Sequence, residues 1–119
     1  LLVRNPIDIF KSLKGYFTEE GFKSIFGDLK DYINRWNRVT EEYLEFNKNT
    51  DYCYLIKYED IIMKKSKTLN LICDLGKLNN KQIKKELKIK GKSSSVKISD
   101  KNKEKIKNNC NNLMKKLDY

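Results

Sequence analysis

Two side chains near the start of the sequence are suited to binding phosphate. Arg4 and Ser12 lie eight residues apart, around the segment Arg4-Asn5-Pro6. A guanidinium offers a fork of donors to phosphate oxygens, and a hydroxyl two helical turns further along adds a neutral donor. The other interpretation pairs Arg4 with Asp8 and leaves Ser12 facing solvent. The spacing alone leaves both interpretations open.

The pattern around these residues predicts a strand, a polar turn and a helix. Residues 1–3 are apolar, as at the end of a buried strand, and Pro6 suits the first turn of a helix. In open α/β sheets, ligands gather at the carboxyl ends of strands, where a helix N-terminus presents unpaired N–H groups to anions. We therefore expect Arg4 and Ser12 to flank such a helix N-terminus.

An amphipathic helix is predicted over residues 28–47. Its apolar residues recur at steps of three and four, and Asp28 can cap its N-terminus. Trp36 lies on the apolar face and is expected in the core. The helix needs a partner to cover that face.

A second strand is predicted within residues 52–61, which are rich in aromatic and β-branched residues. A strand, a long helix and another strand form a right-handed crossover, so the two strands are expected to be parallel. Tyr58 lies near the end of the second strand, and Arg4 follows the first. Both side chains should therefore lie at the same edge of the sheet.

The segment LLVRNPIDIFKS resembles the 3′-phosphate-binding segment of sulfotransferases whose donor is 3′-phosphoadenosine 5′-phosphosulfate (PAPS). In that family a strand runs into Arg-Asn-Pro, an Asp follows two residues after the Pro, and a Ser follows eight residues after the Arg. The sequence Tyr58-Glu59-Asp60 is similar to the one that closes the next strand in the family. The resemblance implies that Arg4 and Ser12 hold the 3′-phosphate and that Tyr58 lies against the adenine.

A looser similarity involves Lys90 and Gly91, in the loop-like stretch 89–97. Cytosolic sulfotransferases have an Arg-Lys-Gly loop that gives further phosphate contacts, which makes Lys90 and Gly91 candidate donor-binding residues. A solvated turn is the other interpretation, because the Trp and Asp that commonly follow that loop are missing here.

Glu59 and Asp60 are adjacent carboxylates that could be taken for a catalytic pair. Adjacent residues on one strand point to opposite faces, so the two would not easily share one substrate. We expect structural roles instead, with Glu59 paired to a backbone or basic neighbour and Asp60 capping the segment that follows.

The resemblance implies an α/β fold, part of a P-loop-type three-layer sandwich with parallel strands, flanking helices and a helical C-terminal part. Residues 1–119 would form the C-terminal portion of a single sulfotransferase-like domain. The family's phosphosulfate loop and its general base, a His or a Glu, belong upstream, and this chain has neither a GxxxxGK[ST] loop nor any His. We expect no catalytic residue in this portion and no sulfate transfer by it alone.

For the whole enzyme, the resemblance implies PAPS as donor, 3′,5′-bisphosphoadenosine (PAP) as product, a hydroxyl or amine acceptor, and no metal. The remaining N-terminal half of the domain would be a partner of this portion. The family has cytoplasmic and Golgi branches, and nothing in the residues selects between them or fixes the oligomeric state.

The net charge of +10 is unevenly distributed: residues 1–76 hold 12 basic and 12 acidic side chains, and residues 77–119 hold 14 and 4. The basic tail could bind a polyanion as a non-enzymatic module, or it could be a solvated face. No aromatic residues interleave with its lysines until Tyr119, so nucleic acid is not an expected partner. A P-loop kinase-like nucleotide-binding fragment is a further alternative.

The remaining segments give simpler predictions. Residues 15–27 are expected to be a loop with a short helical piece, residues 66–75 a helix ended by Gly76, and residues 80–88 a basic helix. Ser99 can cap a last helix whose apolar stripe is Ile106, Cys110, Leu113, Met114 and Leu117. Cys53 and Cys73 are expected as small core residues, and a disulfide involving Cys110 remains open. The three cysteines show no metal-ligand spacing, and histidine is absent, so a zinc site is not expected.

Overall fold

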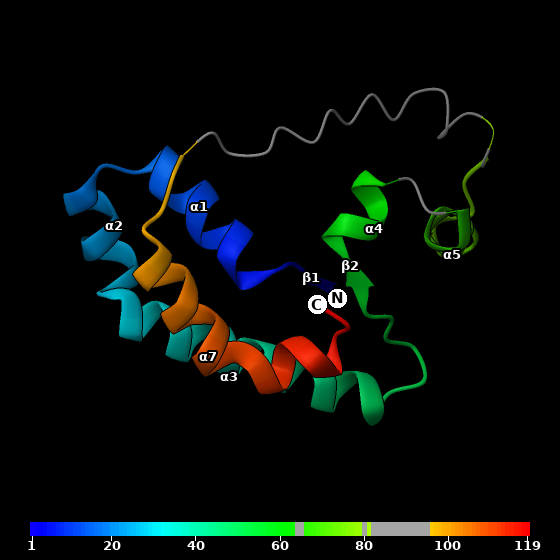
Figure 1. Ribbon diagram of the computed structural model, residues 1–119. Coiled ribbons are helices and arrows are strands. Elements are labelled where there is room, and N and C mark those ends of the chain that lie inside the picture. Colours follow the sequence, from blue (N-terminus) through cyan, green and yellow to red (C-terminus); the bar gives the residue numbers. More distant parts are fainter. Residues whose placement is uncertain (64–65, 80, 82–95) are drawn as a thin grey trace.

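The structure is a computed structural model of the chain, and it describes residues 1–63, 66–79, 81 and 96–119. In chain order the elements are β1 (Leu2–Val3), α1 (Pro6–Tyr16), α2 (Glu19–Phe26), α3 (Leu29–Lys48), β2 (Ile56–Lys57), α4 (Tyr58–Ile62), α5 (Ser66–Gly76) and α7 (Asp100–Lys116). Helices α1, α2, α3 and α7 form one group, and the two strands lie at its edge with α4 and α5 beyond them (Figure 1).

The fold is mostly helical, and the only sheet among the described residues has two strands. The expected three-layer α/β sandwich is therefore wrong. The region 52–61 accounts for much of the error, because only Ile56 and Lys57 of it are in the sheet and Tyr58 already begins α4. Two strands of two residues cannot form a central layer with helices on both faces.

The two strands are parallel, as the crossover argument predicted. Leu2 lies opposite Ile56, and Val3 lies opposite Lys57. Helices α1, α2 and α3 make the connection between them.

Local capping signals fix the starts of the long helices. Pro6 occupies the first turn of α1, as predicted, and the Asn5 side chain accepts from the Ile7 N–H at 2.9 Å. Helix α3 begins after Asp28, whose side chain accepts from the N–H groups of Lys30 and Asp31 in a capping box. These bonds satisfy donors that have no partner inside the helix.

The segment 15–27 is more helical than predicted. Helix α2 occupies most of it, with the Thr18 side chain accepting from the Gly21 N–H at 3.1 Å. Gly27 ends this helix at φ 74°, a left-handed conformation that glycine adopts without steric cost.

Helix α7 packs across α3 and α1, and the apolar stripe predicted for it is confirmed. Ile106, Cys110, Leu113, Met114 and Leu117 are all buried, and the Ser99 hydroxyl accepts from the Asn102 N–H. The apolar stripe of α7 shares one core with buried residues of α1, α2 and α3, including Trp36, Phe10, Phe22 and Ile33. Cys73 and Cys110 are buried and Cys53 is half-buried, and all three are free thiols.

The ends of α5 and α7 have the same geometry. The Leu78 N–H donates to the Cys73 carbonyl, with Lys77 at φ 52°. The residue in the left-handed conformation is thus Lys77, and the prediction that Gly76 would supply this turn is off by one residue. At the end of α7, Asp118 has φ 55° and the Tyr119 N–H donates to the Met114 carbonyl.

Two predictions lie outside the described residues: the basic helix at 80–88, of which only residue 81 is described, and the candidates Lys90 and Gly91. Across the described part of the chain, no helix combines the length and apolar character required to cross a membrane.

Candidate functional site

The parallel sheet brings Arg4 and Tyr58 together. Arg4 follows β1, Tyr58 follows β2, and the guanidinium carbon of Arg4 lies 4.4 Å from the centroid of the Tyr58 ring. This confirms the expectation that the two side chains meet at one edge of the sheet. A guanidinium over an aromatic face is attracted by the negative potential of the ring.

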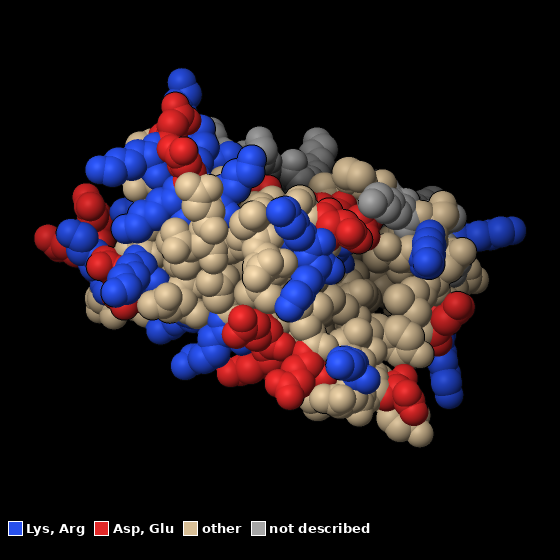
Figure 2. Space-filling model, turned by 60° about the horizontal axis from the view of Figure 1, so that its bottom comes forward, with Lys and Arg blue, Asp and Glu red and all other residues tan. Residues whose placement is uncertain are grey.

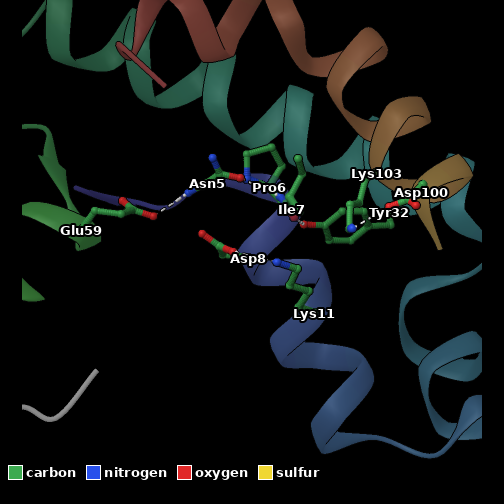
Figure 3. A network of polar contacts seen from close by, with 9 residues as sticks. All are labelled: Asn5, Pro6, Ile7, Asp8, Lys11, Tyr32, Glu59, Asp100 and Lys103. Atoms are coloured by element: carbon green, nitrogen blue, oxygen red, sulfur yellow. Dashed lines mark hydrogen bonds and ion pairs between the residues drawn. The ribbon is translucent and has the colours of Figure 1, made fainter. Parts of the chain in front are cut away.

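One hydrogen-bond donor of the Arg4 guanidinium is unpaired among the described residues. Its Nε is buried and, among the described residues, has no hydrogen-bond partner. Asp8 forms an ion pair with Lys11 at 3.7 Å (Figure 3). No ion pair between Arg4 and Asp8 is found among the described residues. A buried donor without an acceptor is unfavourable, and an anion that supplied the acceptor would remove this cost.

The peptide group between Arg4 and Asn5 is hydrogen-bonded at both its carbonyl and its N–H. Its carbonyl accepts from the indole Nε1–H of Trp36 at 3.3 Å, and its N–H, which belongs to Asn5, donates to Oε1 of Glu59 at 3.0 Å. In the same turn, the Pro6 carbonyl accepts from the Tyr32 hydroxyl at 2.6 Å (Figure 3). Side chains from α3 and α4 therefore fix the turn between β1 and α1.

The N-terminus of α1 does not offer free N–H groups. Asn5 accepts from Ile7 through its side chain, and its carbonyl accepts from the N–H groups of Asp8 and Ile9. Pro6 has no N–H, and Asp8 places a carboxylate in the first turn. The expectation of unpaired backbone donors at this helix end is therefore wrong, and any anion held here depends on side chains such as Arg4.

Ser12 is half-buried on α1 and has no recorded hydrogen bond to another described residue. It is one turn beyond Asp8 on the same stripe of the helix, about 10 Å along the axis from Asn5 at the usual rise per residue. Among the described residues, no hydrogen bond joins Ser12 to Arg4 or Tyr58. The structure thus brings together two of the three matched residues and leaves the third further along α1.

Glu59 is a structural carboxylate, as predicted, and it lies in helix α4 rather than in a strand. Its Oε1 accepts from the Asn5 N–H and its Oε2 accepts from the Tyr119 hydroxyl at 2.8 Å. Asp60 follows it in the first turn of α4. Burial and the neighbouring Glu59 carboxylate raise the pKa of the Tyr119 phenol far above its ordinary value, so the phenol remains a donor.

A hollow of about 220 Å³ opens beside Arg4 on the side facing α3. Its lining is mostly apolar and includes Leu2, Leu13, Val39 and Tyr43, with Arg35 as a second basic residue. Tyr58 and Ser12 are not among the residues that line it.

The polar roles of three aromatic residues were not predicted. Trp36 was expected in the core, where it lies, but its indole N–H also holds the Arg4 carbonyl. Tyr32 and Tyr119 supply hydroxyls to the same region. A buried Tyr or Trp needs a partner for its polar end, and this requirement was the available signal.

Comparison with known proteins gave no match to a protein-family model, to a curated protein or to a solved structure.

Proposed function

We propose that this chain is the C-terminal portion of a PAPS-dependent sulfotransferase, and that it binds the 3′-phosphate and adenine side of the donor. The observation that supports the proposal most strongly is the Arg4 guanidinium, which lies over Tyr58 and whose buried Nε has no hydrogen-bond partner within the described part of the chain. A phosphate dianion is an acceptor of the charge and geometry that a guanidinium prefers.

The proposed roles are those of a remote handle on the nucleotide. Arg4 donates to the 3′-phosphate, Ser12 adds a hydroxyl donor, Tyr58 lies against the purine, and Lys90 and Gly91 contribute further phosphate contacts. Binding energy gained there positions the sulfur atom for in-line transfer to an acceptor hydroxyl or amine. The base and the groups that neutralise the transferring oxygens are assigned to an N-terminal portion, so this chain should bind PAP without transferring sulfate.

Titration calorimetry of the 119-residue chain with PAP, 5′-AMP and ATP tests the proposal. PAP should bind more tightly than either competitor, because only PAP carries a 3′-phosphate. Arg4→Ala should weaken PAP binding by about 1.5–3 kcal/mol, the range for hydrogen bonds to charged groups, or roughly 10- to 150-fold. Equal affinity for PAP in the parent and in Arg4→Ala would refute the role of Arg4, and preference for ATP would favour a kinase-like nucleotide site.

Arg38→Ala is the matched control for this experiment. Arg38 is an exposed arginine of α3, and its recorded ion pair is with Glu42 at 3.8 Å. It changes the net charge as Arg4→Ala does, without touching the turn after β1. PAP affinity should therefore stay at the parental value.

The excess of lysine after residue 76 supports a second candidate, a module that binds polyanions. Figure 2 shows basic and acidic side chains on the same face, with an area of other residues between them. Heparin binding that falls steeply with salt and survives Arg4→Ala would favour it. Heparin binding that is absent at physiological salt would exclude it.

A further inference from the structure

Glu59 joins three parts of the chain that are far apart in sequence. One carboxylate oxygen accepts from the Asn5 N–H at 3.0 Å, and the other accepts from the Tyr119 hydroxyl at 2.8 Å. Both bonds are partly shielded from water, which strengthens them relative to bonds at the surface. The carboxylate is thus constrained from two directions.

Glu59 and its backbone partner Asn5 are each the sequence neighbour of one member of the Arg4–Tyr58 pair. Asn5 directly follows Arg4, and Glu59 directly follows Tyr58. A shift of Glu59 would therefore move the peptide group behind the guanidinium and the helical turn that bears the aromatic ring. The 4.4 Å separation between guanidinium and ring depends on both.

The end of α7 brings Tyr119 to this point. The left-handed conformation of Asp118 reverses the chain, and the Tyr119 N–H closes the turn on the Met114 carbonyl at 2.9 Å. Lys57 holds the same turn from the sheet, since its Nζ donates to the Asp118 carbonyl at 3.2 Å and lies 5.3 Å from the centroid of the Tyr119 ring. The position of Tyr119 therefore also depends on contacts other than its bond to Glu59, namely those with Met114 and Lys57.

We infer that Tyr119 is a positioning residue for the anion-binding pair: it orients Glu59, which holds Arg4 and Tyr58 in register. The ligand named for this pair rests on the proposed function, whereas the positioning does not. If Tyr119 only stabilised the end of α7, its hydroxyl would affect melting and leave the Arg4 guanidinium unchanged.

Tyr119→Phe removes the hydroxyl and keeps the ring under Lys57. The readout is the Nε–H signal of Arg4 in ¹⁵N spectra, which is identified by its loss in Arg4→Lys. In Tyr119→Phe this signal should move toward those of exposed arginines, and its exchange with water should become several-fold faster. Tyr52→Phe is the control, because Tyr52 is 92% exposed and should leave the signal unchanged.

The route through Glu59 is tested by repeating the substitution in a Glu59→Ala background. Tyr119→Phe should then have no further effect on the Arg4 signal. An Arg4 signal that is identical in the parent and in Tyr119→Phe would overturn the inference, as would an unchanged effect in the Glu59→Ala background.

PAP titration separates this inference from the proposed function. If PAP binds, Tyr119→Phe should lower its affinity several-fold while reducing the preference for PAP over 5′-AMP. If PAP does not bind the parent chain, the proposed function fails, and the Arg4 signal still decides whether Tyr119 positions the pair.

Discussion

The guanidinium carbon of Arg4 lies 4.4 Å from the centroid of the Tyr58 ring, although 54 positions separate the two residues in sequence. Two parallel strands of two residues each make this contact possible, because they end at the same edge of the sheet. The ring has a negative face but no net charge, so it attracts the guanidinium without forming an ion pair with it. The contact therefore orients a charge without neutralising it.

A double-mutant cycle on Arg4 and Tyr58 should measure this contact. Tyr58→Leu removes the aromatic face, Arg4→Ala removes the cation, and the coupling free energy should be about 0.5–2 kcal/mol in favour of the pair. Tyr58→Phe is the control, since it keeps the ring and no hydrogen bond of the Tyr58 hydroxyl is recorded among the described residues. Urea unfolding of the parent, the two single variants and the double variant would give the coupling free energy. Strictly additive effects would show that the two side chains do not interact.

Tyr32→Phe should destabilise the protein through the turn after β1. The Tyr32 hydroxyl donates to the Pro6 carbonyl at 2.6 Å, and both residues are buried. Without the hydroxyl, the carbonyl loses its partner in a dry environment, which costs about 1–3 kcal/mol of unfolding free energy. Chemical denaturation at neutral pH measures the change.

Tyr16→Phe is the matched control for that experiment, because the Tyr16 side chain is 83% exposed. A surface change of this kind usually stays within about 0.5 kcal/mol of the parent. Equal unfolding free energies for Tyr32→Phe and Tyr16→Phe would mean that water replaces the lost bond, and the turn would then be less protected than its geometry indicates.

Local patterns predicted the parts of the fold that depend on local physics. Pro6 at the start of α1, Asp28 capping α3 and the apolar stripe of α7 each follow from a few neighbouring residues, and each is confirmed. The meeting of Arg4 and Tyr58 was also predictable, because strands joined by a helical crossover are parallel and their carboxyl ends lie on the same side of the sheet.

The contacts that hold the site could not be read from local patterns. Glu59 bonds to Asn5 and Tyr119, which lie 54 and 60 positions away, and a carboxylate has no periodicity that points to such partners. The sheet was overestimated for a related reason. Residues 52–55 have high strand propensity, yet only Ile56 and Lys57 of this region are in the sheet, paired with Leu2 and Val3.

The three cysteines should differ sharply in reactivity. Cys53 is half-buried, whereas Cys73 and Cys110 are 3% and 1% exposed. Burial also raises the pKa of the Cys110 thiol to about 11, so very little reactive thiolate is present at neutral pH. Alkylation followed by mass spectrometry should label Cys53 first, and label Cys73 and Cys110 only at the rate of unfolding.

The raised pKa of the Cys110 thiol also determines how the free energy of unfolding changes at high pH. Because the folded chain holds the Cys110 proton more tightly than the unfolded chain, this thiol stabilises the fold below its ordinary pKa, and the stabilisation is lost as the pH rises toward about 11. Cys110→Ala should flatten that part of the stability profile. Labelling of Cys110 ahead of Cys53 in the native protein would contradict the placement of α7 in the core.

Asp118→Gly should stabilise the protein. Asp118 has φ 55°, a conformation that costs a residue with a side chain on the order of 1 kcal/mol and costs glycine almost nothing. The bond from Lys57 goes to the backbone carbonyl of Asp118, so the substitution keeps that bond and the path of the chain to Tyr119. Greater flexibility of glycine in the unfolded chain offsets part of the gain, and we expect a net increase of up to about 1 kcal/mol in unfolding free energy. Asp118→Ala lacks the conformational advantage of glycine and should be no more stable than the parent, so equal unfolding midpoints for the alanine and glycine variants would show that the left-handed turn carries no strain.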